Sequence, residues 1–365
     1  KFDKKKSSNL KVKKILITTD GTGGHVIPAQ IIKEHLENDY QVYFSTDVRG
    51  LKYLSSDIDK TLIIDTPRFI FNLSFLFKII KILYLILKSL FFLKIKKIKK
   101  IISIGGYMSL PVIISATILR LPIFLVEPNL VLGKGNKFFL NFANKIFCYS
   151  DELPNFPKKH LSKIELIKPL VPKAFYQIQK KQVINDKFCF LIFGGSQGAQ
   201  IFDNLFKDIM LEISNFFSIK VIQQTTKDNM QNLKKFYDLN KIENIIFDFD
   251  QDLINLINIS DMCIVRAGAT SLAEISFLEK PFLTIPLPTS KDNHQMKNAE
   301  FYEKKGCCWI FDQKRINKVK LTNFIINLLS DKTDLINKKK NLQKLNNLNS
   351  WAHINQKLKA TINEN

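Results

Sequence analysis

Residues 13–25 read KKILITTDGTGGH, an apolar run that ends in a glycine-rich turn. The run predicts a buried strand over Lys13–Thr19, and the sequence after the turn, His25–Leu36, has the pattern of a helix. The same order returns later in the chain, where Phe188–Phe193 predicts a strand, the loop Gly194–Gly198 follows, and Ala199–Ile213 predicts a helix. A chain that restarts from a second glycine-rich loop is typical of two doubly wound domains.

Further strands are predicted between and after these two units. Each is a short apolar segment, and they cover Gln41–Ser45, Lys100–Ile104, Pro122–Val126, Ile219–Gln223, Asn244–Phe247, Met262–Val265 and Phe282–Ile285. Strands that alternate with helices form parallel sheets with helices on both faces. With 365 residues, the chain is long enough for two such domains. We therefore predict an α/β protein that binds its ligand in the cleft between the domains, at the carboxyl ends of the strands.

Composition narrows the class of protein. Hydrophobic residues make up 45% of the chain, and its five cysteines include no CxxC pair. A disulfide scaffold and a zinc cage are therefore not expected, and free thiols fit a reducing compartment. No apolar signal core precedes the first motif, so we expect the protein to stay in the cytoplasm. The net charge of +22 favours an anionic partner.

The distribution of charge helps to decide which anionic partner it is. Residues 66–126 contain no Asp or Glu but ten Lys and Arg, and Phe69–Leu93 is almost wholly Phe, Leu and Ile. Lys78, Lys81 and Lys88 interrupt the segment, which argues against a membrane span. A core helix with a solvated edge remains an alternative. Basic and apolar residues together favour a helix that lies in an anionic membrane interface, and they argue against a nucleic-acid partner.

The two glycine-rich loops, 20–25 and 193–199, are candidate phosphate sites. Each follows a strand and opens a helix, where glycine lets the backbone approach an anion and the helix presents free N–H groups. Neither matches the P-loop or the dinucleotide fingerprint. Tight turns also use glycine for structural reasons alone, but two such loops facing one cleft favour two phosphate-bearing ligands.

His25 follows the first loop directly and is a candidate general base. The helix dipole would lower its pKa and keep the imidazole neutral. A helix-capping histidine is the alternative. Of the other histidines, His35, His160 and His353 stand in polar surroundings and are expected at the surface. No pair of histidines has the spacing of metal ligands. Asp248, Asp250 and Asp252 are the nearest candidate set, but they open a predicted helix, where acids are favoured anyway, so we expect no metal and no cofactor.

Two segments of the second half carry further polar groups. Residues 266–274 (RAGATSLAE) leave a predicted strand and start a helix, and Glu274 could accept both hydroxyls of a ribose. Residues 291–299 (KDNHQMKNA) start another helix, in which Gln295 and Asn298 share a face and could bind sugar hydroxyls. A plain helix-terminal acid and a solvated surface are the respective alternatives.

Together these motifs resemble glycosyltransferase family 28, and in particular its UDP-N-acetylglucosamine transferases that complete the lipid-linked cell-wall precursor. The resemblance runs in order along nearly the whole chain. It is carried by Gly21–His25 with Pro28 and Ala29, Gly105–Pro111, Glu127–Asn129, Gly194–Ala199, Arg266–Ala269 with Glu274, and His294–Ala299. Family members have the GT-B architecture, which implies two Rossmann-like domains with an interdomain cleft.

The resemblance implies a division of roles within the cleft. His25 would be the general base in a single inverting displacement that releases UDP, with Glu274 on the ribose and Gln295 near the sugar. The acceptor diphosphate would meet Gly105, Gly106 and Tyr107. The full set of expected donor contacts is Thr22, Gly23, Gly24, Asn129, Ser196, Ala269, Thr270, Ser271, Leu272, Ala273, Glu274, Gln295 and Asn298.

The expected organisation follows from these roles. We expect an acceptor- and membrane-binding domain over residues 1–165, a UDP-N-acetylglucosamine domain over 166–349, and a helix over 350–365 that returns to the first domain. The expected partners are UDP-N-acetylglucosamine, undecaprenyl-diphosphate-linked muramyl-pentapeptide and an anionic membrane surface. The protein would be peripheral, on the cytoplasmic face of the bacterial inner membrane.

The chain also departs from the family pattern. Asp20 stands where the family usually has glycine, and an acid beside an anion site is unfavourable unless its side chain points away. Val171 stands where a donor-contacting Arg is expected, and Lys168 or Lys173 could supply the charge instead. A diacylglycerol sugar transferase, a UDP-N-acetylglucosamine 2-epimerase-like isomerase and an inactive membrane scaffold remain as alternative functions.

Overall fold

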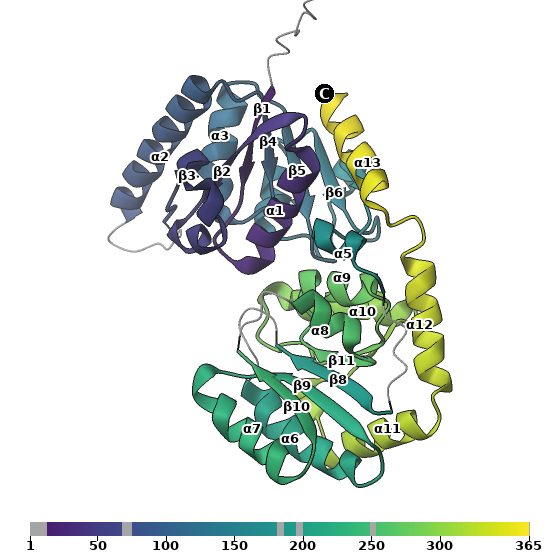
Figure 1. The fold of residues 1–365 in the computed structure, drawn as a ribbon. Coiled ribbons are helices and arrows are strands. Elements are labelled where there is room, and N and C mark those ends of the chain that lie inside the picture. The colour runs from purple at the N-terminus through teal and green to yellow at the C-terminus, as the bar shows by residue number, and fades with distance from the viewer. Residues whose placement is uncertain (1–12, 68–74, 181–185, 195–199, 249–252, 365) are drawn as a thin grey trace, which may run out of the picture.

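The computed structural model describes residues 13–67, 75–180, 186–194, 200–248 and 253–364. Within these residues the chain forms two α/β domains, each built on one parallel sheet (Figure 1). This confirms the prediction of two doubly wound domains. In both sheets the strand order reverses direction beside the first strand, between β1 and β4 and between β8 and β11. Loops diverge at such a point, and a ligand crevice forms at the carboxyl ends of the strands.

The described part of the first domain has a seven-stranded sheet in the order β3-β2-β1-β4-β5-β6-β7. Its strands are β1 (Lys13–Thr18), β2 (Tyr40–Thr46), β3 (Thr61–Ile63), β4 (Lys100–Ser103), β5 (Ile123–Glu127), β6 (Lys145–Cys148) and β7 (Ile164–Leu166). The central pair, β1 and β4, is in register from Ile15 opposite Lys100 to Thr18 opposite Ser103. Both strands therefore end at one level, and the loops that follow them lie side by side.

Helices cover both faces of this sheet, because its central strands are apolar on both sides. One face packs on α1 (Gly23–Leu36) and on the last helix of the chain, α13 (Trp351–Asn363). The other face packs on α2 (Phe75–Lys96), α3 (Leu110–Ile118) and α4 (Lys134–Phe139).

The second domain is arranged in the same way, with six described strands in the order β10-β9-β8-β11-β12-β13. They are β8 (Phe188–Phe193), β9 (Ile219–Gln224), β10 (Glu243–Phe247), β11 (Met262–Val265), β12 (Phe282–Thr284) and β13 (Cys308–Ile310). One face is covered by α5 (Lys173–Gln177), α8 (Leu253–Ile259), α9 (Ala269–Phe277), α10 (His294–Lys304) and α12 (Thr333–Leu345). The other face is covered by α6 (Gln200–Ser214), α7 (Met230–Leu239) and α11 (Lys318–Ser330).

The chain returns to the first domain at its C-terminal end, where α13 lies beside α1 (Figure 1). Ile354, Leu358 and Ile362 are fully buried in the core of that domain. The ring of Trp351 stacks on His35 of α1 with centroids 3.5 Å apart. His35 is therefore buried, as is His160, and the prediction that they lie at the surface is wrong. The prediction relied on the charged residues that flank each histidine, but a helix with charged neighbours can still bury one side chain.

Helix α2 is apolar on two opposite faces. Ile82, Leu85 and Leu93 are buried against the domain, and α2 packs on α3. The opposite face is a set of large side chains, each more than half exposed, and we call it the apolar face of α2. Its members are Leu76, Phe77, Ile80, Leu83, Tyr84, Leu87, Phe91 and Ile95. Residues three and four apart share one side of a helix, so these side chains form one continuous stripe. A core helix with only a solvated edge does not have such a stripe.

None of the helices that the structure describes has the length and apolarity needed to cross a membrane.

Candidate active site

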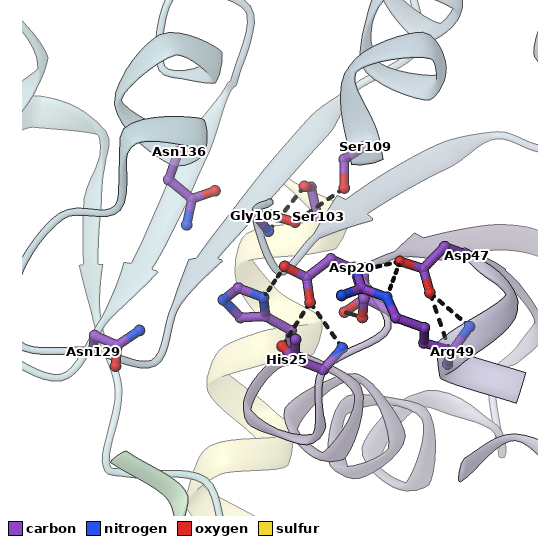
Figure 2. Close-up of polar contacts among 12 residues, drawn as sticks. Asp20, His25, Asp47, Arg49, Ser103, Gly105, Ser109, Asn129 and Asn136 are labelled. Atoms are coloured by element: carbon purple, nitrogen blue, oxygen red, sulfur yellow. Dashed lines mark hydrogen bonds and ion pairs between the residues drawn. The ribbon is translucent and has the colours of Figure 1, made fainter. Parts of the chain in front are cut away.

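The loops after β1, β4 and β5 meet at the carboxyl edge of the first sheet and carry most of the polar residues predicted for that domain (Figure 2). Thr22 and Gly24 of the first loop are exposed, and a Cβ atom added to Gly24 would meet nothing within 4 Å. Gly21 is different, because a Cβ atom there would lie 1.9 Å from Oδ1 of Asp47. The loop therefore packs tightly on one side and is open on the other, where helix α1 begins.

His25 is paired with Asp20 across this loop (Figure 2). Oδ1 of Asp20 accepts hydrogen bonds from the backbone N–H of Thr22 at 2.9 Å and from its hydroxyl at 2.6 Å. Oδ2 of Asp20 lies 2.8 Å from Nδ1 of His25. The other ring nitrogen, Nε2, points away from Asp20, and 24% of the His25 side chain is exposed. The carboxylate thus faces the imidazole and the loop backbone, and His25 keeps one nitrogen for a ligand.

This pairing reverses the expected pKa shift of His25. Burial alone would lower the pKa, but the contact with Asp20 outweighs it, and Glu127 adds a smaller effect in the same direction, so the pKa of His25 is raised. Lys291 of the second domain opposes the rise. Burial disfavours the Asp20 carboxylate, yet His25 and Thr22 bring the pKa of Asp20 well below its usual range. The prediction of a lowered His25 pKa is wrong, because a carboxylate in contact outweighs a helix dipole.

Gly105 and Gly106 pass through a narrow gap beside this pair. Both have positive φ angles, +95° and +82°, which glycine adopts without strain. A Cβ atom on Gly105 would lie 3.0 Å from the amide of Asn136, and one on Gly106 would lie 2.9 Å from the side chain of Asp20. Ser109 donates to the carbonyl of Gly105 at 3.1 Å and fixes the turn. The glycines therefore bring the backbone of this loop against Asp20, and Tyr107 follows at the partly exposed edge.

Glu127 organises the third loop. Only 2% of this residue is exposed, and its carboxylate is fully engaged by the segment that follows β5. Oε1 accepts from the backbone and the side-chain amide of Asn129, both at 3.2 Å. Oε2 accepts from Gly133 N–H at 2.8 Å and from Asn136 Nδ2 at 3.0 Å. The carboxylate replaces backbone partners that an irregular loop lacks, so Asn129 is held in a defined place.

Arg49 is a cation at the same edge that was not predicted. It follows β2, and its guanidinium donates to Oδ2 of Asp47 at 2.5 Å and 3.0 Å. Its charge also interacts with Asp20 and Tyr107, and 54% of its side chain is exposed. The available signal was its position just after a predicted strand, at the edge where the other loops meet.

The second domain contributes helix α9. Its first turn, Ala269–Ser271, is partly exposed, whereas Leu272 and Ala273 are buried, so those two could serve a ligand only through their backbone. Glu274 is also buried, and burial raises its pKa to about 8. Arg266 turns inward and donates to the carbonyl of Ile285 at 2.8 Å.

Helix α10 carries the other predicted donor residues. Gln295 is partly exposed, and its Oε1 accepts from Leu287 N–H at 2.9 Å. Asn298 is only 1% exposed and contacts the first domain, where its Oδ1 accepts from Leu130 N–H at 2.9 Å. Ser196 and most of its loop lie outside the described residues. Groups of three or more His, Cys, Asp or Glu that could hold a metal ion are not found in the described ranges.

A ligand cannot reach Val171, the position at which the family pattern has an Arg that contacts the donor. Val171 is fully buried in the core. Lys168 donates to the carbonyl of Leu345 at 3.0 Å, and the ammonium of Lys173 lies 5.9 Å from the ring centre of Trp351. Lys291 of the second domain is a cation whose charge does act on His25.

Comparisons with known proteins cover both domains. Residues 15–148 match the model of the Glycosyltransferase family 28 N-terminal domain, and residues 189–354 match that of its C-terminal domain. A relative from Pelagibacter ubique is 45% identical over 97% of this chain and 99% of its own length. A relative from Rickettsia felis is 32% identical over 91% of this chain and 95% of its own. Both are named UDP-N-acetylglucosamine–N-acetylmuramyl-(pentapeptide) pyrophosphoryl-undecaprenol N-acetylglucosamine transferase.

Solved structures agree on the fold. The crystal structure of Acinetobacter baumannii MurG superposes with a TM-score of 0.74 at 21% identity, over 91% of this chain and 95% of that chain. That likeness extends over most of both chains, and two domains with one parallel sheet each are the GT-B arrangement. With both domain models matched in order and a relative 45% identical along the whole length, the chain belongs to glycosyltransferase family 28.

Proposed function

We propose that the protein transfers N-acetylglucosamine from UDP-N-acetylglucosamine to undecaprenyl-diphospho-muramyl-pentapeptide. One observation carries this proposal: a relative with that printed activity is 45% identical over 97% of this chain. The site geometry is compatible with it, because His25 keeps one ring nitrogen for a ligand, and its partner Asp20 lies against Gly106 at the carboxyl edge of the first sheet.

In the proposed reaction His25 acts as the general base. Nε2 takes the proton of the acceptor hydroxyl while that oxygen attacks the anomeric carbon and UDP leaves from the opposite side. Asp20 keeps Nδ1 protonated, so that Nε2 carries the lone pair, and it stabilises the imidazolium that forms. The N-terminus of α9 lies toward the UDP side and stabilises the developing charge on the diphosphate.

The two domains divide the substrates in this proposal. The sugar nucleotide lies along α9 and α10, with Glu274 on the ribose, Gln295 near the sugar and Ser196 and residues 269–273 around the diphosphate. Asn129 and residues 22–24 complete that site from the first domain. The acceptor diphosphate meets residues 105–107. We propose the domain ranges expected from the sequence, residues 1–165 and 166–349, with the helix over 350–365 as part of the first domain.

We further propose that the apolar face of α2 rests on the cytoplasmic leaflet of the inner membrane. Eight large apolar side chains, more than half exposed, are unusual on a surface that faces only water. Exposed lysines adjoin them, among them Lys94, Lys97 and Lys99. Buried apolar area combined with attraction to anionic lipid holds such a helix in the interface. The acceptor's diphosphate lies at that surface, so docking brings the cleft to its substrate.

The deciding experiment incubates the purified protein with labelled UDP-N-acetylglucosamine and undecaprenyl-diphospho-muramyl-pentapeptide. Labelled lipid product together with released UDP is the expected result. Transfer to diacylglycerol but not to undecaprenyl-diphospho-muramyl-pentapeptide would show that the proposed acceptor is wrong. Turnover of the nucleotide without lipid would indicate an isomerase, and no turnover with intact UDP binding would indicate an inactive scaffold.

A further inference from the structure

The loop after β5 is joined to the second domain through one buried side chain, Asn298. Its Oδ1 accepts from Leu130 N–H at 2.9 Å, and its Nδ2 donates to Oδ1 of Asn129 at 3.3 Å and to the carbonyl of Ala267 at 3.1 Å. Asn298 is 1% exposed and Leu130 is 8% exposed. Both ends of the Asn298 amide are therefore engaged, with two partners in the first domain and one in the second.

These bonds fix the amide of Asn129 from both ends. Its Nδ2 donates to Glu127 and its Oδ1 accepts from Asn298. An amide has two N–H donors and two acceptor lone pairs. One donor and one acceptor of Asn129 thus remain for a ligand, in an orientation set by one residue of each domain. Asn129 itself is partly exposed, as a ligand contact must be.

A second contact joins the same two elements. Nζ of Lys134, at the start of α4, lies 2.9 Å from Oδ1 of Asp292, which precedes α10. Asp292 and Asn293 have φ angles of +52° and +55°, in the left-handed region that Asp and Asn adopt more readily than other residues with a side chain. This turn leads directly into the first turn of α10, which carries Gln295. Both interdomain contacts therefore flank the proposed sugar subsite.

We propose that Asn298 is a positioning residue that joins the two domains at the sugar subsite and acts on the sugar through Asn129. Without it, Leu130 N–H and the Ala267 carbonyl lose their partners and the amide of Asn129 can rotate. The uridine part of the donor lies on the second domain in our proposal, so UDP binding should depend little on this contact. The inference rests on the proposed use of UDP-N-acetylglucosamine as donor.

The test compares the affinities of UDP-N-acetylglucosamine and UDP by calorimetry, in a double-mutant cycle of Asn129→Ala and Asn298→Ala. Each single variant should bind UDP-N-acetylglucosamine roughly tenfold more weakly, the size of one or two lost hydrogen bonds. Affinity for UDP should change less than about threefold, within the effect expected of a distant site. The double variant should be no weaker than either single variant by more than about threefold, because Asn298 acts through Asn129. Lys297→Gln, on the same helix, is the control and should bind both ligands as the wild type does.

Three results would overturn the inference. In the double variant the fold-losses of UDP-N-acetylglucosamine affinity seen in the two single variants could multiply, which would make Asn298 an independent sugar contact. UDP binding could fall as much as UDP-N-acetylglucosamine binding, which would make its role generally structural. UDP-N-acetylglucosamine binding could also stay unchanged in Asn298→Ala. If the wild-type protein bound UDP-N-acetylglucosamine no more tightly than UDP, the proposed donor would be refuted instead.

A second variant keeps the test decisive if Asn298→Ala does not fold. Asp292→Asn removes the ion pair with Lys134 at a surface position, so the fold should survive. It should weaken UDP-N-acetylglucosamine binding about two- to threefold at low salt and leave UDP binding unchanged, consistent with the modest strength of an exposed pair. No loss for UDP-N-acetylglucosamine in this variant would contradict the role of the interdomain contact.

Discussion

The Nε2 atom of His25 is the group on which the proposed chemistry depends. His25→Ala should lower kcat by about 10²–10⁴-fold, the usual contribution of a general base. Kd for UDP should stay near the wild-type value, because our proposal places the nucleotide on the second domain. Steady-state transfer rates and calorimetry measure the two quantities. His353→Ala, an exposed histidine on α13, is the control. An unchanged rate in His25→Ala would remove this residue from the mechanism.

Asp20 should determine the pH at which His25 becomes active. His25 accepts a proton only when it is neutral, and Asp20 raises its pKa, so kcat/KM should rise with pH through a midpoint above that of an ordinary histidine. Asp20→Asn removes the carboxylate, lowers that pKa and should move the acid limb of the profile to lower pH. The plateau rate should also fall, because a less basic imidazole is a weaker base.

The pairing itself can be tested in the background of His25→Ala. There, Asp20→Asn should have little further effect on the rate, since its influence passes through the imidazole. Additive losses in the double variant, or an acid limb that stays in place in Asp20→Asn alone, would show that Asp20 serves only the fold of the loop.

Glu274 should couple donor binding to proton release. Burial raises its pKa to about 8, so the carboxyl is largely protonated at pH 7. A carboxylate can accept hydrogen bonds from both ribose hydroxyls, so UDP should bind the ionised form better and lower the pKa. Binding at pH 7.5 should therefore release protons, and affinity should increase from pH 7 to pH 9. Calorimetry in two buffers of different ionisation enthalpy measures the release, which Glu274→Gln should abolish. Equal heats in both buffers for the wild type would contradict the assignment.

At the scale of elements, the apolar face of α2 and its lysines should determine membrane binding. Lys94→Gln, Lys97→Gln and Lys99→Gln together should weaken binding to anionic vesicles, since each well-placed lysine contributes about 1 kcal/mol. Lys100 does not belong to this set, although its place in the sequence suggests it, because its Nζ donates to the carbonyl of Ile362 in α13. Sedimentation with vesicles at increasing salt should show weaker binding as the charges are screened.

The apolar part of the same face needs its own variants. Leu83→Ser with Leu87→Ser should weaken vesicle binding at all salt concentrations and leave UDP binding intact. Phe216→Ser, at an exposed position of the second domain, is the matched control. Equal binding of the wild type and the α2 variants to neutral and anionic vesicles would show that this face has no membrane role.

Elements were predictable where the local pattern was strong. Nine predicted strands are present, with ends that differ by at most one residue. The strands β3, β6, β7 and β13 were missed, because runs of three or four residues flanked by polar ones carry too little periodicity. The turn from strand to helix at the first glycine loop was predictable, because the loop directly follows an apolar run. The contact of Asp20 with His25 and that of Asn298 with Asn129 were not, since one depends on turn geometry and the other on how two domains meet.

At the scale of the whole molecule, α13 follows the second domain in the sequence but packs on the first domain in space. The chain completes the second domain with α12 and then returns, so Leu358 contributes to the core of the first domain. Lys359 forms an ion pair with Asp39, and Tyr40 donates to Asn363 at 2.6 Å, which fix the helix at its far end. A residue near the C-terminus is therefore expected to stabilise the N-terminal domain.

Calorimetric unfolding with and without UDP can test this expectation. UDP binds the second domain in our proposal, so it should raise the unfolding temperature of that domain and identify its transition. Leu358→Ala leaves a cavity in a fully buried site and should cost about 2–5 kcal/mol. Leu358→Ala should lower the temperature of the unfolding transition that UDP does not shift. Leu321→Ala, in the core of the second domain, should lower the temperature of the transition that UDP shifts. Gln356→Ala, at an exposed position on α13, should change neither unfolding temperature. If Leu358→Ala lowered the UDP-responsive transition instead, α13 would be energetically part of the domain that precedes it in the sequence.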